Sequence, residues 1–232
     1  MQNIFILTGA GISAESGLKT FRDADGLWEG HRVEDVATPE AYTANPTRVH
    51  QFYNQRRSQL LSAKPNEAHM ALAELKRAYG KQLTIVTQNV DDLHERAGLN
   101  DVIHMHGELL KQRCECCDFV SDCRSDTHPS TQCNKCHQIG TVRPHIVWFG
   151  EMPLEMEQIY QQLAHTEIFA AIGTSGLVYP AAGFAAEAKR HGAKLIEVNL
   201  TDTEISPIFD EHIQGSATEV VPQWVMGLID QV

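Results

Sequence analysis

Short apolar runs alternate with amphipathic segments along most of this chain of 232 residues. The apolar runs predict six strands, and the segments between them predict helices with apolar residues every three or four positions. Strands that alternate with helices favour an α/β fold with a mostly parallel sheet covered on both faces. The predicted strands are residues 4–8, 83–88, 102–106, 167–172, 194–199 and 218–221. The predicted helices are residues 66–79, 154–164, 180–191 and 222–231.

Two stretches interrupt this alternation. Residues 18–65 are rich in aromatic residues, charge and proline, and they predict one clear helix with Asn45 as N-cap and Pro46 in its first turn. Residues 108–143 hold all six cysteines and show little apolar periodicity. We expect both stretches to be insertions that together build a smaller lobe. The remaining residues, 1–17, 66–107 and 144–232, would form a Rossmann-like nucleotide-binding domain.

A glycine-rich turn follows the first predicted strand. Residues 9–14 read Gly-Ala-Gly-Ile-Ser-Ala and fit G-x-G-x-x-G/A, in which glycine lets the backbone approach a pyrophosphate. The same pattern also fits an ordinary tight turn, but its place directly after a strand favours phosphate binding. A dehydrogenase should carry an acidic residue at a strand end about twenty residues further on. Asp23 does not lie at the end of a predicted strand. We therefore expect the protein to bind a nucleotide but to lack the strand arrangement of a dehydrogenase.

Polar side chains follow the second and third predicted strands. Asn89 and Asp91 come after the second strand, and two histidines, His104 and His106, lie at the end of the third. Because the C-terminal ends of parallel strands line the ligand crevice, these groups should converge near the glycine turn. They suit substrate orientation and general-base catalysis, although Asn89 and Asp91 could instead cap the next helix. Strand alternation places both histidines on one side, and the position before Gly107 favours His106.

The cysteines predict a structural zinc site. Two pairs, each with a two-residue gap, are separated by fifteen residues, which is the spacing of a four-thiolate zinc ribbon. Four thiolates leave no open coordination position, so the metal should be structural. Cys116 and Cys123 fall outside this repeat. The expected ligands are Cys114, Cys117, Cys133 and Cys136.

Charge and hydrophobicity narrow the class of protein further. Lys and Arg number 19 and Asp and Glu number 30, which gives a net charge of -11. An acidic surface repels phosphate backbones, so neither nucleic-acid binding nor a nucleic-acid-reading zinc ribbon is expected. The apolar run at residues 4–7 is too short for a signal peptide or a membrane span. We therefore expect a cytoplasmic protein without membrane association.

Taken in order, these motifs resemble the sirtuin family from end to end. Besides the two cysteine pairs, the matching segments are residues 9–13, 21–22, 87–91, 106–107, 144–151, 173–175 and 197–199. The resemblance is closest to the bacterial sirtuins of the desuccinylase-like class. One departure lies at residues 17–22, which read Gly-Leu-Lys-Thr-Phe-Arg where the family frequently has Gly-Ile-Pro-Asp-Phe-Arg.

The resemblance implies an NAD-dependent protein lysine deacylase that consumes NAD as a co-substrate. Nicotinamide leaves, the acyl-lysine carbonyl oxygen attacks the ribose, and His106 acts as general base on a ribose hydroxyl. Asn89 and Asp91 orient NAD and a water, and the products are free lysine, nicotinamide and O-acyl-ADP-ribose. The expected NAD-site residues are Gly9, Ala10, Gly11, Ser13, Phe21, Arg22, Gln88, Asn89, Asp91, Gly173, Thr174, Ser175, Asn199, Leu200 and Ala217.

The helix after Pro46 carries a candidate acyl pocket. Helical spacing places Tyr53 and Arg56 on one face with Val49 and Leu60. An arginine there is costly unless it meets an anion or hydrogen-bond acceptors, and a buried ion pair or a side chain that reaches water would also explain it. The sequence Tyr53-x-x-Arg56 resembles the pair that reads acidic acyl groups in the desuccinylase-like class. A guanidinium and a phenol would bind a succinyl or malonyl carboxylate.

The resemblance also implies where the rest of the substrate lies. Ala37 resembles the small residue that leaves room for an acidic acyl group. Acylated lysine segments of other proteins would bind as an added strand between residues 147–151 and 176–179. The expected substrate contacts in the first of these segments are Val147, Phe149 and Gly150.

Three other functions share parts of this pattern. An NAD-dependent oxidoreductase would produce NADH, so nicotinamide release without the absorbance of NADH would exclude it. An ADP-ribosyltransferase would transfer label from NAD to protein. A non-catalytic zinc-ribbon binding module would leave the glycine turn and the polar strand ends without a role.

Overall fold

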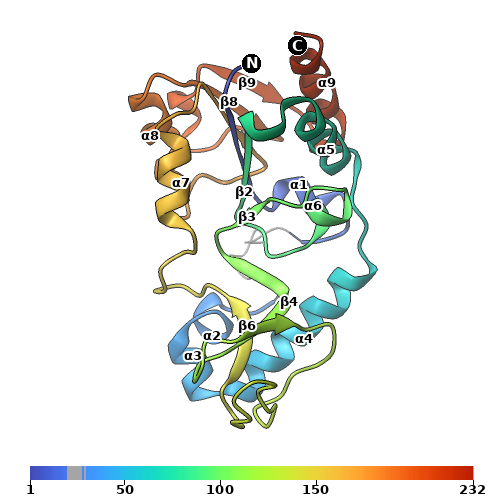
Figure 1. Cartoon of the computed structure of the whole chain (residues 1–232), viewed down its shortest axis with the longest axis vertical. Coiled ribbons are helices and arrows are strands. Elements are labelled where there is room, and N and C mark those ends of the chain that lie inside the picture. The colour runs from blue at the N-terminus through green and yellow to red at the C-terminus, as the bar shows by residue number, and fades with distance from the viewer. Residues whose placement is uncertain (20–27, 29, 232) are drawn as a thin grey trace.

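The computed structural model describes residues 1–19, 28 and 30–231, and it has two lobes (Figure 1). The larger lobe is built on a six-stranded sheet, and both termini lie at its far end. The smaller lobe contains a three-stranded sheet beside helices α2 (Val33–Val36), α3 (Pro39–Ala44) and α4 (Pro46–Ser62). The strands of the large sheet are β1 (Ile4–Thr8), β2 (Leu83–Thr87), β3 (Ile103–His104), β7 (Ile168–Ile172), β8 (Lys194–Asn199) and β9 (Glu211–Gln214).

The large sheet is entirely parallel, with the strand order β3-β2-β1-β7-β8-β9. Numbered within this sheet, the order is 3-2-1-4-5-6, so the direction of winding reverses between β1 and β7. In open parallel sheets, ligands bind outside the C-terminal ends of the strands at such a reversal. Gly9 follows β1 and Gly173 follows β7, so the glycine turn lies at this point. The predicted Rossmann-like parallel sheet is confirmed.

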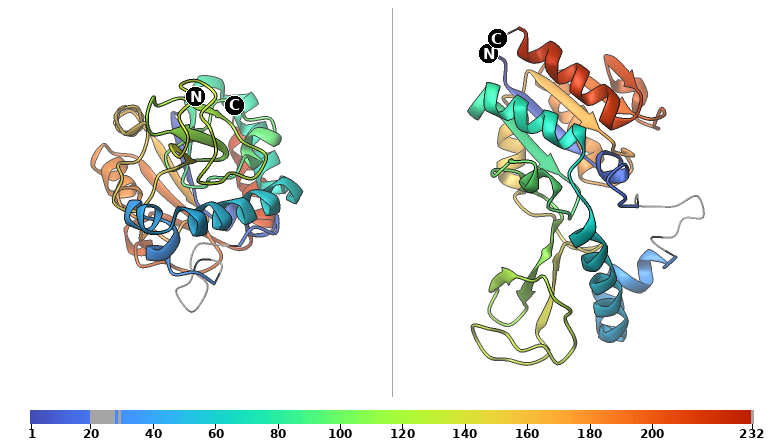
Figure 2. Two further views of the ribbon diagram at one scale, coloured as in Figure 1. Left: turned by 90° about the horizontal axis from the view of Figure 1, so that it is seen from below. Right: turned by 90° about the vertical axis from the view of Figure 1, so that its right-hand side faces the viewer.

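Helices cover both faces of the large sheet (Figure 2). In β1, Ile4 and Ile6 pack with α5 (Glu67–Tyr79) and α9 (Ala217–Ile229), whereas Phe5 and Leu7 pack with α7 and α8 on the opposite face. Helix α7 spans Met156–Leu163 and α8 spans Phe184–Arg190. Because both faces are covered, all five residues of β1 are buried, which explains its uninterrupted apolar sequence.

Shorter elements complete the larger lobe. They are the helices α1 (Gly11–Ala14) and α6 (Leu93–Arg96) and the 3₁₀ turns η1 (Gly80–Gln82), η2 (Ala181–Gly183) and η3 (Ser206–Ile208). Within the described residues, no helix is both long enough and apolar enough to cross a membrane.

The smaller lobe combines the two predicted insertions. Its antiparallel sheet has the order β5-β4-β6, with β4 at Gly107–Cys114, β5 at Val120–Asp122 and β6 at Val142–Ile146. Helix α4 (Pro46–Ser62) packs on this sheet, and the predicted N-cap holds, since Asn45 Oδ1 accepts the Arg48 amide at 3.0 Å. Two further short helices, α2 (Val33–Val36) and α3 (Pro39–Ala44), precede α4, where the sequence predicted one helix only.

The last predicted strand, residues 218–221, is wrong. These residues lie in the first turns of α9, and the sixth strand is β9, seven residues earlier. Strand β9 lies at the sheet edge with alternating half-buried and exposed residues, so it lacks the apolar run that marks the central strands. The apolar residue Val221 is instead buried in the core between α9 and α5.

The contact between the glycine turn and the end of β7 gives a direct test of this architecture. A Cβ on Gly11 would lie 2.6 Å from Gly173 Cα and 2.9 Å from Gly173 O. Both neighbours are backbone atoms, so no side chain can rotate away. Gly11→Ala should therefore lower the free energy of unfolding by about 1–3 kcal/mol, the usual cost of overpacking, in urea titrations.

The matched control is Gly227→Ala in α9. No atom lies within 4 Å of a Cβ at Gly227, so this variant should be as stable as the wild type or more stable. Equal stability of Gly11→Ala and the wild type would contradict the close approach of the two strand ends.

Candidate functional site

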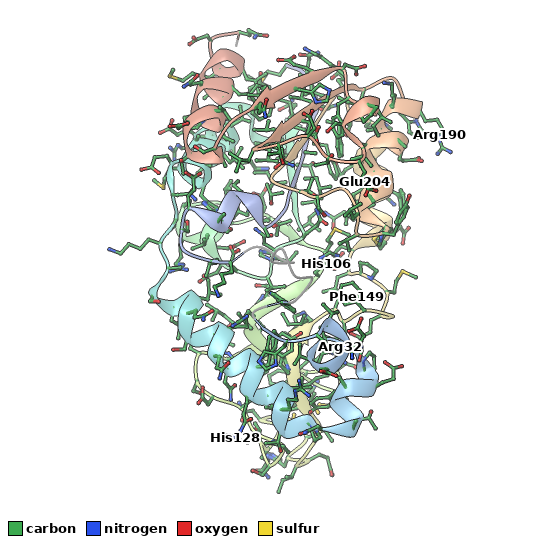
Figure 3. All side chains as sticks on the ribbon, turned by 180° about the vertical axis from the view of Figure 1, so that it is seen from behind. Arg32, His106, His128, Phe149, Arg190 and Glu204 are labelled. Carbon is green, nitrogen blue, oxygen red and sulfur yellow. The ribbon has the colours of Figure 1, made fainter. Side chains whose placement is uncertain are left out.

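The expected site residues gather where the two lobes meet, at the C-terminal ends of β1, β2, β7 and β8. Figure 3 shows His106 and Phe149 at this junction. The first contacts are between backbones, since the Gly9 amide donates to Ile172 O at 3.0 Å and the Gly11 amide donates to Gly173 O at 2.8 Å. Helix α1 is a single turn, so the backbone of the glycine turn, rather than a long helix dipole, would face a phosphate.

A buried hydrogen-bonded cluster fixes the predicted orienting residues. Asn89 Nδ2 donates to Gly9 O and to Ser13 Oγ, both at 3.1 Å, and Ser13 Oγ donates to Asp91 Oδ2 at 3.0 Å. Asp91 Oδ1 also accepts the Leu93 amide at 3.1 Å, so Asp91 bonds the first amide of α6, although the N-cap position itself is Asp92. Burial raises the pKa of Asp91. The cluster therefore ties the end of β2 to the glycine turn.

A second polar layer, which the sequence did not reveal, lies beneath this cluster. Thr8 Oγ1 donates to Thr87 Oγ1 at 2.9 Å and lies 3.0 Å from His94 Nε2. The ring of His94 lies 5.0 Å from that of His69, and both histidines are fully buried. Burial lowers the pKa of His69 to about 4 and that of His94 well below its usual value, so both rings are neutral at pH 7. The sequence carried one local signal for the position of His69, because Asn66 and His69 form the capping box of α5.

Thr174 joins three strand ends at the outer side of the site. Its hydroxyl accepts from Gln88 Nε2 at 2.9 Å, and its carbonyl accepts from Asn199 Nδ2 at 2.8 Å. Asn199 Oδ1 accepts the amide of Leu200, whose side chain is exposed. These contacts bring the expected residues of β2, β7 and β8 together.

The remaining expected NAD-site residues lie at the edges. Ser175 Oγ accepts the Leu177 amide at 3.4 Å. Ala217 starts α9, whose first turn is bound to the glycine-turn helix because Glu15 accepts from the Thr218 hydroxyl at 2.7 Å. Phe21 and Arg22 lie outside the described residues.

The structure separates the two candidate histidines. His106 Nδ1 lies 3.0 Å from Gln88 O, and a carbonyl can only accept, so Nδ1 carries the hydrogen and Nε2 is the basic nitrogen. Burial lowers the pKa of His106. His104 ends β3 and bonds Glu95 at 2.9 Å, and this contact outweighs burial and raises the pKa of His104. Of the two, His106 is therefore the imidazole whose surroundings favour the neutral form.

Gly107 allows the chain to turn directly after His106. Its φ is +82°, and a Cβ there would lie 2.1 Å from His145 O on β6. The His106 carbonyl accepts the Val147 amide at 2.9 Å, so the histidine is bound to the segment that follows β6.

The candidate acyl-binding residues lie on α4 and at the end of α2, beside that same segment. Tyr53 and Ala37 are buried, and the Phe149 amide donates to Ala37 O at 3.0 Å. Arg56 lies one turn after Tyr53 on α4, with its guanidinium 4.8 Å from the ring centre of Phe52. Ala37 and Tyr53 therefore contact the expected peptide segment, and Arg56 lies one turn from Tyr53 on the same helix.

Arg57, the neighbour of Arg56, was not identified from the sequence and is the more deeply buried of the two arginines. Arg57 is 1% exposed, and it donates to Leu109 O at 3.3 Å and to Asn54 Oδ1 at 2.8 Å. Asn54 also exchanges two hydrogen bonds with the Thr127 backbone, and His50 Nδ1 lies 2.8 Å from Thr127 Oγ1. Helix α4 is therefore fastened to the cysteine-bearing loop by the face that carries His50, Asn54 and Arg57.

Four cysteines in the smaller lobe form a metal-binding arrangement. Their Sγ atoms all lie within 4.8 Å of one another, with Cys114–Cys136 at 3.6 Å and Cys117–Cys133 at 3.7 Å. Zinc–sulfur bonds of about 2.3 Å in a tetrahedron require sulfur atoms about 3.8 Å apart, so this set fits zinc. The exposed Cys116 and the buried Cys123 lie outside the cluster.

Comparisons with known proteins agree with this geometry. Residues 9–180 match the Sir2 family. The chain is 55% identical to the NAD-dependent protein deacylase of Salmonella typhimurium over 96% of its length and 82% of that protein. The protein of the same name from Escherichia coli (strain K12) is 55% identical, over 97% of this chain and 82% of that protein.

Solved structures give the same result. A mutant Sir2 homologue in complex with ADP ribose matches with a TM-score of 0.90 and 38% identity, over 99% of this chain and 93% of that one. A Sir2 homologue in complex with NAD matches with a TM-score of 0.89 and 39% identity, over 99% of this chain and 90% of that one. The chain belongs to the Sir2 family, and the resemblance in its sequence motifs is confirmed.

The cysteine geometry predicts a zinc dependence that can be measured apart from activity. The purified protein should contain about one zinc per chain, and Cys133→Ser should lose it. Since metal binding supports local folding, the loop between the cysteine pairs should then become sensitive to protease. Activity should fall as a secondary effect, because this loop holds α4.

Cys116→Ser is the matched control, since Cys116 lies in the same knuckle but outside the cluster. It should keep its zinc and its resistance to protease. A stable and active protein without metal would overturn the structural role of zinc.

Proposed function

We propose that this member of the Sir2 family is an NAD-dependent protein lysine deacylase. The observation that carries the proposal is the His106 imidazole, whose Nδ1–H bonds Gln88 O directly after β2 and whose Nε2 remains basic. The proteins of Salmonella typhimurium and Escherichia coli named NAD-dependent protein deacylase support it. Mass spectrometry of reactions with NAD and acyl-lysine peptides should detect nicotinamide, free lysine and O-acyl-ADP-ribose.

The polar groups fit NAD as a co-substrate. Bound NAD would supply a ribose carbon that becomes electrophilic as nicotinamide leaves. Asn89 and Asp91, each less than 9% exposed and held by Ser13, would orient NAD and a water. His106 would accept a proton from a ribose hydroxyl at Nε2, and its lowered pKa keeps that nitrogen free at neutral pH.

Acylated lysine segments of other proteins are the proposed substrates. Residues 147–151 and 176–179 offer main chain and exposed apolar side chains, including Phe149 and Tyr179. The amides of Val147 and Phe149 are already bonded to His106 O and Ala37 O. An added peptide strand would therefore bond mainly to carbonyl groups of this segment.

We propose further that the acyl pocket accepts succinyl and malonyl groups. Arg56 would bind the acyl carboxylate and Tyr53 would donate to it, while Ala37 leaves room. The aromatic and aliphatic residues packed around Tyr53 exclude water, which strengthens a charged hydrogen bond there.

His106→Ala should lower deacylation by about a hundredfold or more, which is the usual scale of general-base catalysis. The fold and the zinc content should be retained, because the site cluster of Ser13, Asn89 and Asp91 does not include His106. Steady-state kcat/KM with one acetyl-lysine peptide measures the loss. His104→Gln removes the other candidate histidine and should cost much less.

The pH profile gives an independent check on His106. Its pKa is lowered by burial, so the neutral base persists below the usual 6.5, and the acid-side fall in kcat/KM should lie below that pH. Near-normal turnover by a folded His106→Ala protein would reject His106 as the base.

Arg56→Met should lower the ratio of kcat/KM for a succinyl peptide to that for the acetyl form of the same peptide. The succinyl carboxylate would lose a charge-assisted hydrogen bond worth about 1.5–3 kcal/mol, or roughly ten- to hundredfold, whereas acetyl has no carboxylate. Tyr53→Phe should lower the ratio less, because it removes a neutral donor.

Arg48→Met is the matched control on the same helix. Arg48 is exposed and already pairs with Asp35 at 3.0 Å, so the ratio should not change. An equal loss with both peptides in Arg56→Met would make Arg56 a structural residue and would remove the basis for acidic-acyl recognition.

A further inference from the structure

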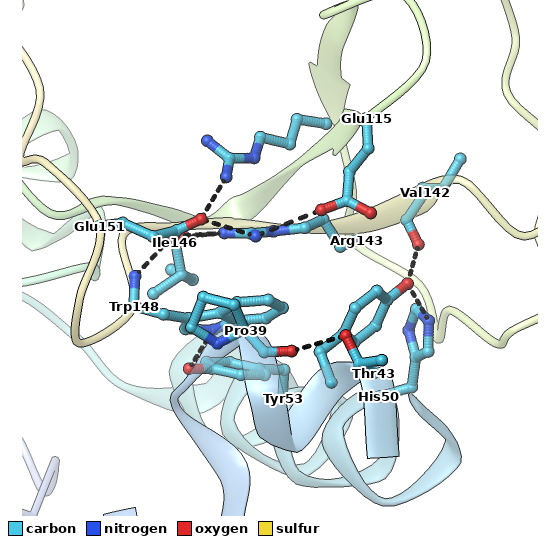
Figure 4. A network of polar contacts seen from close by, with 12 residues as sticks. Pro39, Thr43, His50, Tyr53, Glu115, Val142, Arg143, Ile146, Trp148 and Glu151 are labelled. Carbon is cyan, nitrogen blue, oxygen red and sulfur yellow. Dashed lines mark hydrogen bonds and ion pairs between the residues drawn. The ribbon is translucent and has the colours of Figure 1, made fainter. Parts of the chain in front are cut away.

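The Tyr53 phenol lies at the end of a chain of contacts with the buried Trp148 and Arg143 and the half-buried Glu151 (Figure 4). The Trp148 indole N–H donates to the Tyr53 hydroxyl oxygen at 2.9 Å, and each side chain is at most 2% exposed. An indole N–H is a donor only, so the direction of this bond is fixed. The Tyr53 oxygen is therefore an acceptor here, and its single hydrogen is left for another partner.

That hydrogen meets no acceptor among residues 1–19, 28 and 30–231. Burial raises the pKa of Tyr53, so the phenol keeps its hydrogen at neutral pH. A buried hydroxyl hydrogen without an acceptor costs free energy, which a ligand oxygen in the pocket would recover. Arg56, one turn along α4, favours a ligand oxygen that carries negative charge.

The indole that sets this direction is itself held on two sides. The Arg143 guanidinium carbon lies 3.5 Å from the centre of the Trp148 ring, and a cation over an aromatic face attracts it. Arg143 donates two hydrogen bonds to Glu151, at 2.8 and 2.7 Å, and Glu151 also accepts the Trp148 amide at 2.8 Å. Within such a buried network each bond polarises the next, so the arginine charge makes the indole N–H a better donor.

We propose that Trp148 is a positioning residue for acyl recognition, because its indole N–H fixes the Tyr53 hydroxyl as a donor toward a succinyl or malonyl carboxylate. The inference rests on the proposed function, since it adds a residue to the same pocket. Arg143 and Glu151 act through Trp148. Trp148 and Glu151 also flank Phe149 and Gly150, so one set of contacts holds both the acyl pocket and the proposed peptide segment.

Trp148→Phe tests the inference, because phenylalanine keeps an aromatic ring under Arg143 and loses the N–H. The readout is the ratio of kcat/KM for succinyl and acetyl forms of one peptide, in which any general loss of activity cancels. The ratio should fall about three- to tenfold, the scale of one neutral hydrogen bond. Replacement of Trp148 by β-(3-benzothienyl)alanine, which has sulfur in place of N–H in the same bicyclic shape, should give the same fall if the phenylalanine variant folds poorly.

A double-mutant cycle separates orientation from packing. In the Trp148→Phe background, Tyr53→Phe should lower the ratio by less than it does alone, because the phenol is already unoriented. Tyr42→Phe is the control, since the Tyr42 ring lies 5.2 Å from that of Trp148 and its hydroxyl bonds Val142 O instead of Tyr53. This variant should leave the ratio unchanged.

The outcomes distinguish this inference from the proposed function. If Arg56→Met lowers the ratio while both Trp148 replacements leave it unchanged, acidic-acyl recognition stands and the role of Trp148 is rejected. If Arg56→Met also leaves the ratio unchanged, the acyl pocket itself is rejected together with this inference. If the effects of Trp148→Phe and Tyr53→Phe on the ratio are additive, the two residues do not act through one hydrogen bond and the inference is rejected.

Discussion

The close approach of two strand ends is the constraint on which the candidate site depends. Gly11 and Gly173 lie so near each other that a methyl group on either would strike backbone. This contact brings the glycine turn within reach of Asn89 and brings Thr174 within reach of Gln88 and Asn199. The polar groups of four strands therefore converge because two residues have no side chain.

Helix α4 relates the smaller lobe to the chemistry of the larger one. One face carries Tyr53 and Arg56 toward the expected substrate, and another carries Asn54 and Arg57, which bond the cysteine loop and β4. The cysteine-bearing loop and the proposed acyl-binding residues are therefore held by the same helix. Strand β4 adds a second connection, since it runs from Gly107 beside His106 to the metal ligand Cys114.

Features set by neighbouring residues were predictable from sequence. The cysteine pairs, the Asn45 cap and the central strands each carry a local signal in spacing or in apolar runs. Features set by distant contacts were not predictable. The bond between Trp148 and Tyr53 joins residues 95 positions apart, and nothing in either neighbourhood indicates it. The edge strand β9 was missed for the same reason. It is held by its pairing with β8, and its own sequence has no apolar run.

The same division between local signals and distant contacts applies to the candidate site. The sequence identified Asn89, Asp91 and His106 as neighbours of the glycine turn, because parallel strands end on one side of a sheet. Strand alternation did not separate His104 from His106, and only the position before Gly107 favoured His106. The structure separates them by the partner of each ring, which is Glu95 for His104 and the Gln88 carbonyl for His106. It also placed a costly arginine at Arg56, whereas burial falls mainly on Arg57.

The buried neutral histidines have a consequence for the protein in acid. Burial lowers the pKa of His69, beneath the candidate NAD site, and of His50, at the cysteine loop, to about 4. In the unfolded chain these rings take up protons near their usual 6.5, so protons bind the unfolded state preferentially between those values. The contribution of these two rings to stability is therefore full above pH 6.5 and declines as the pH falls toward 4. His69 lies in the larger lobe and His50 in the smaller one, so acidification should weaken both lobes together.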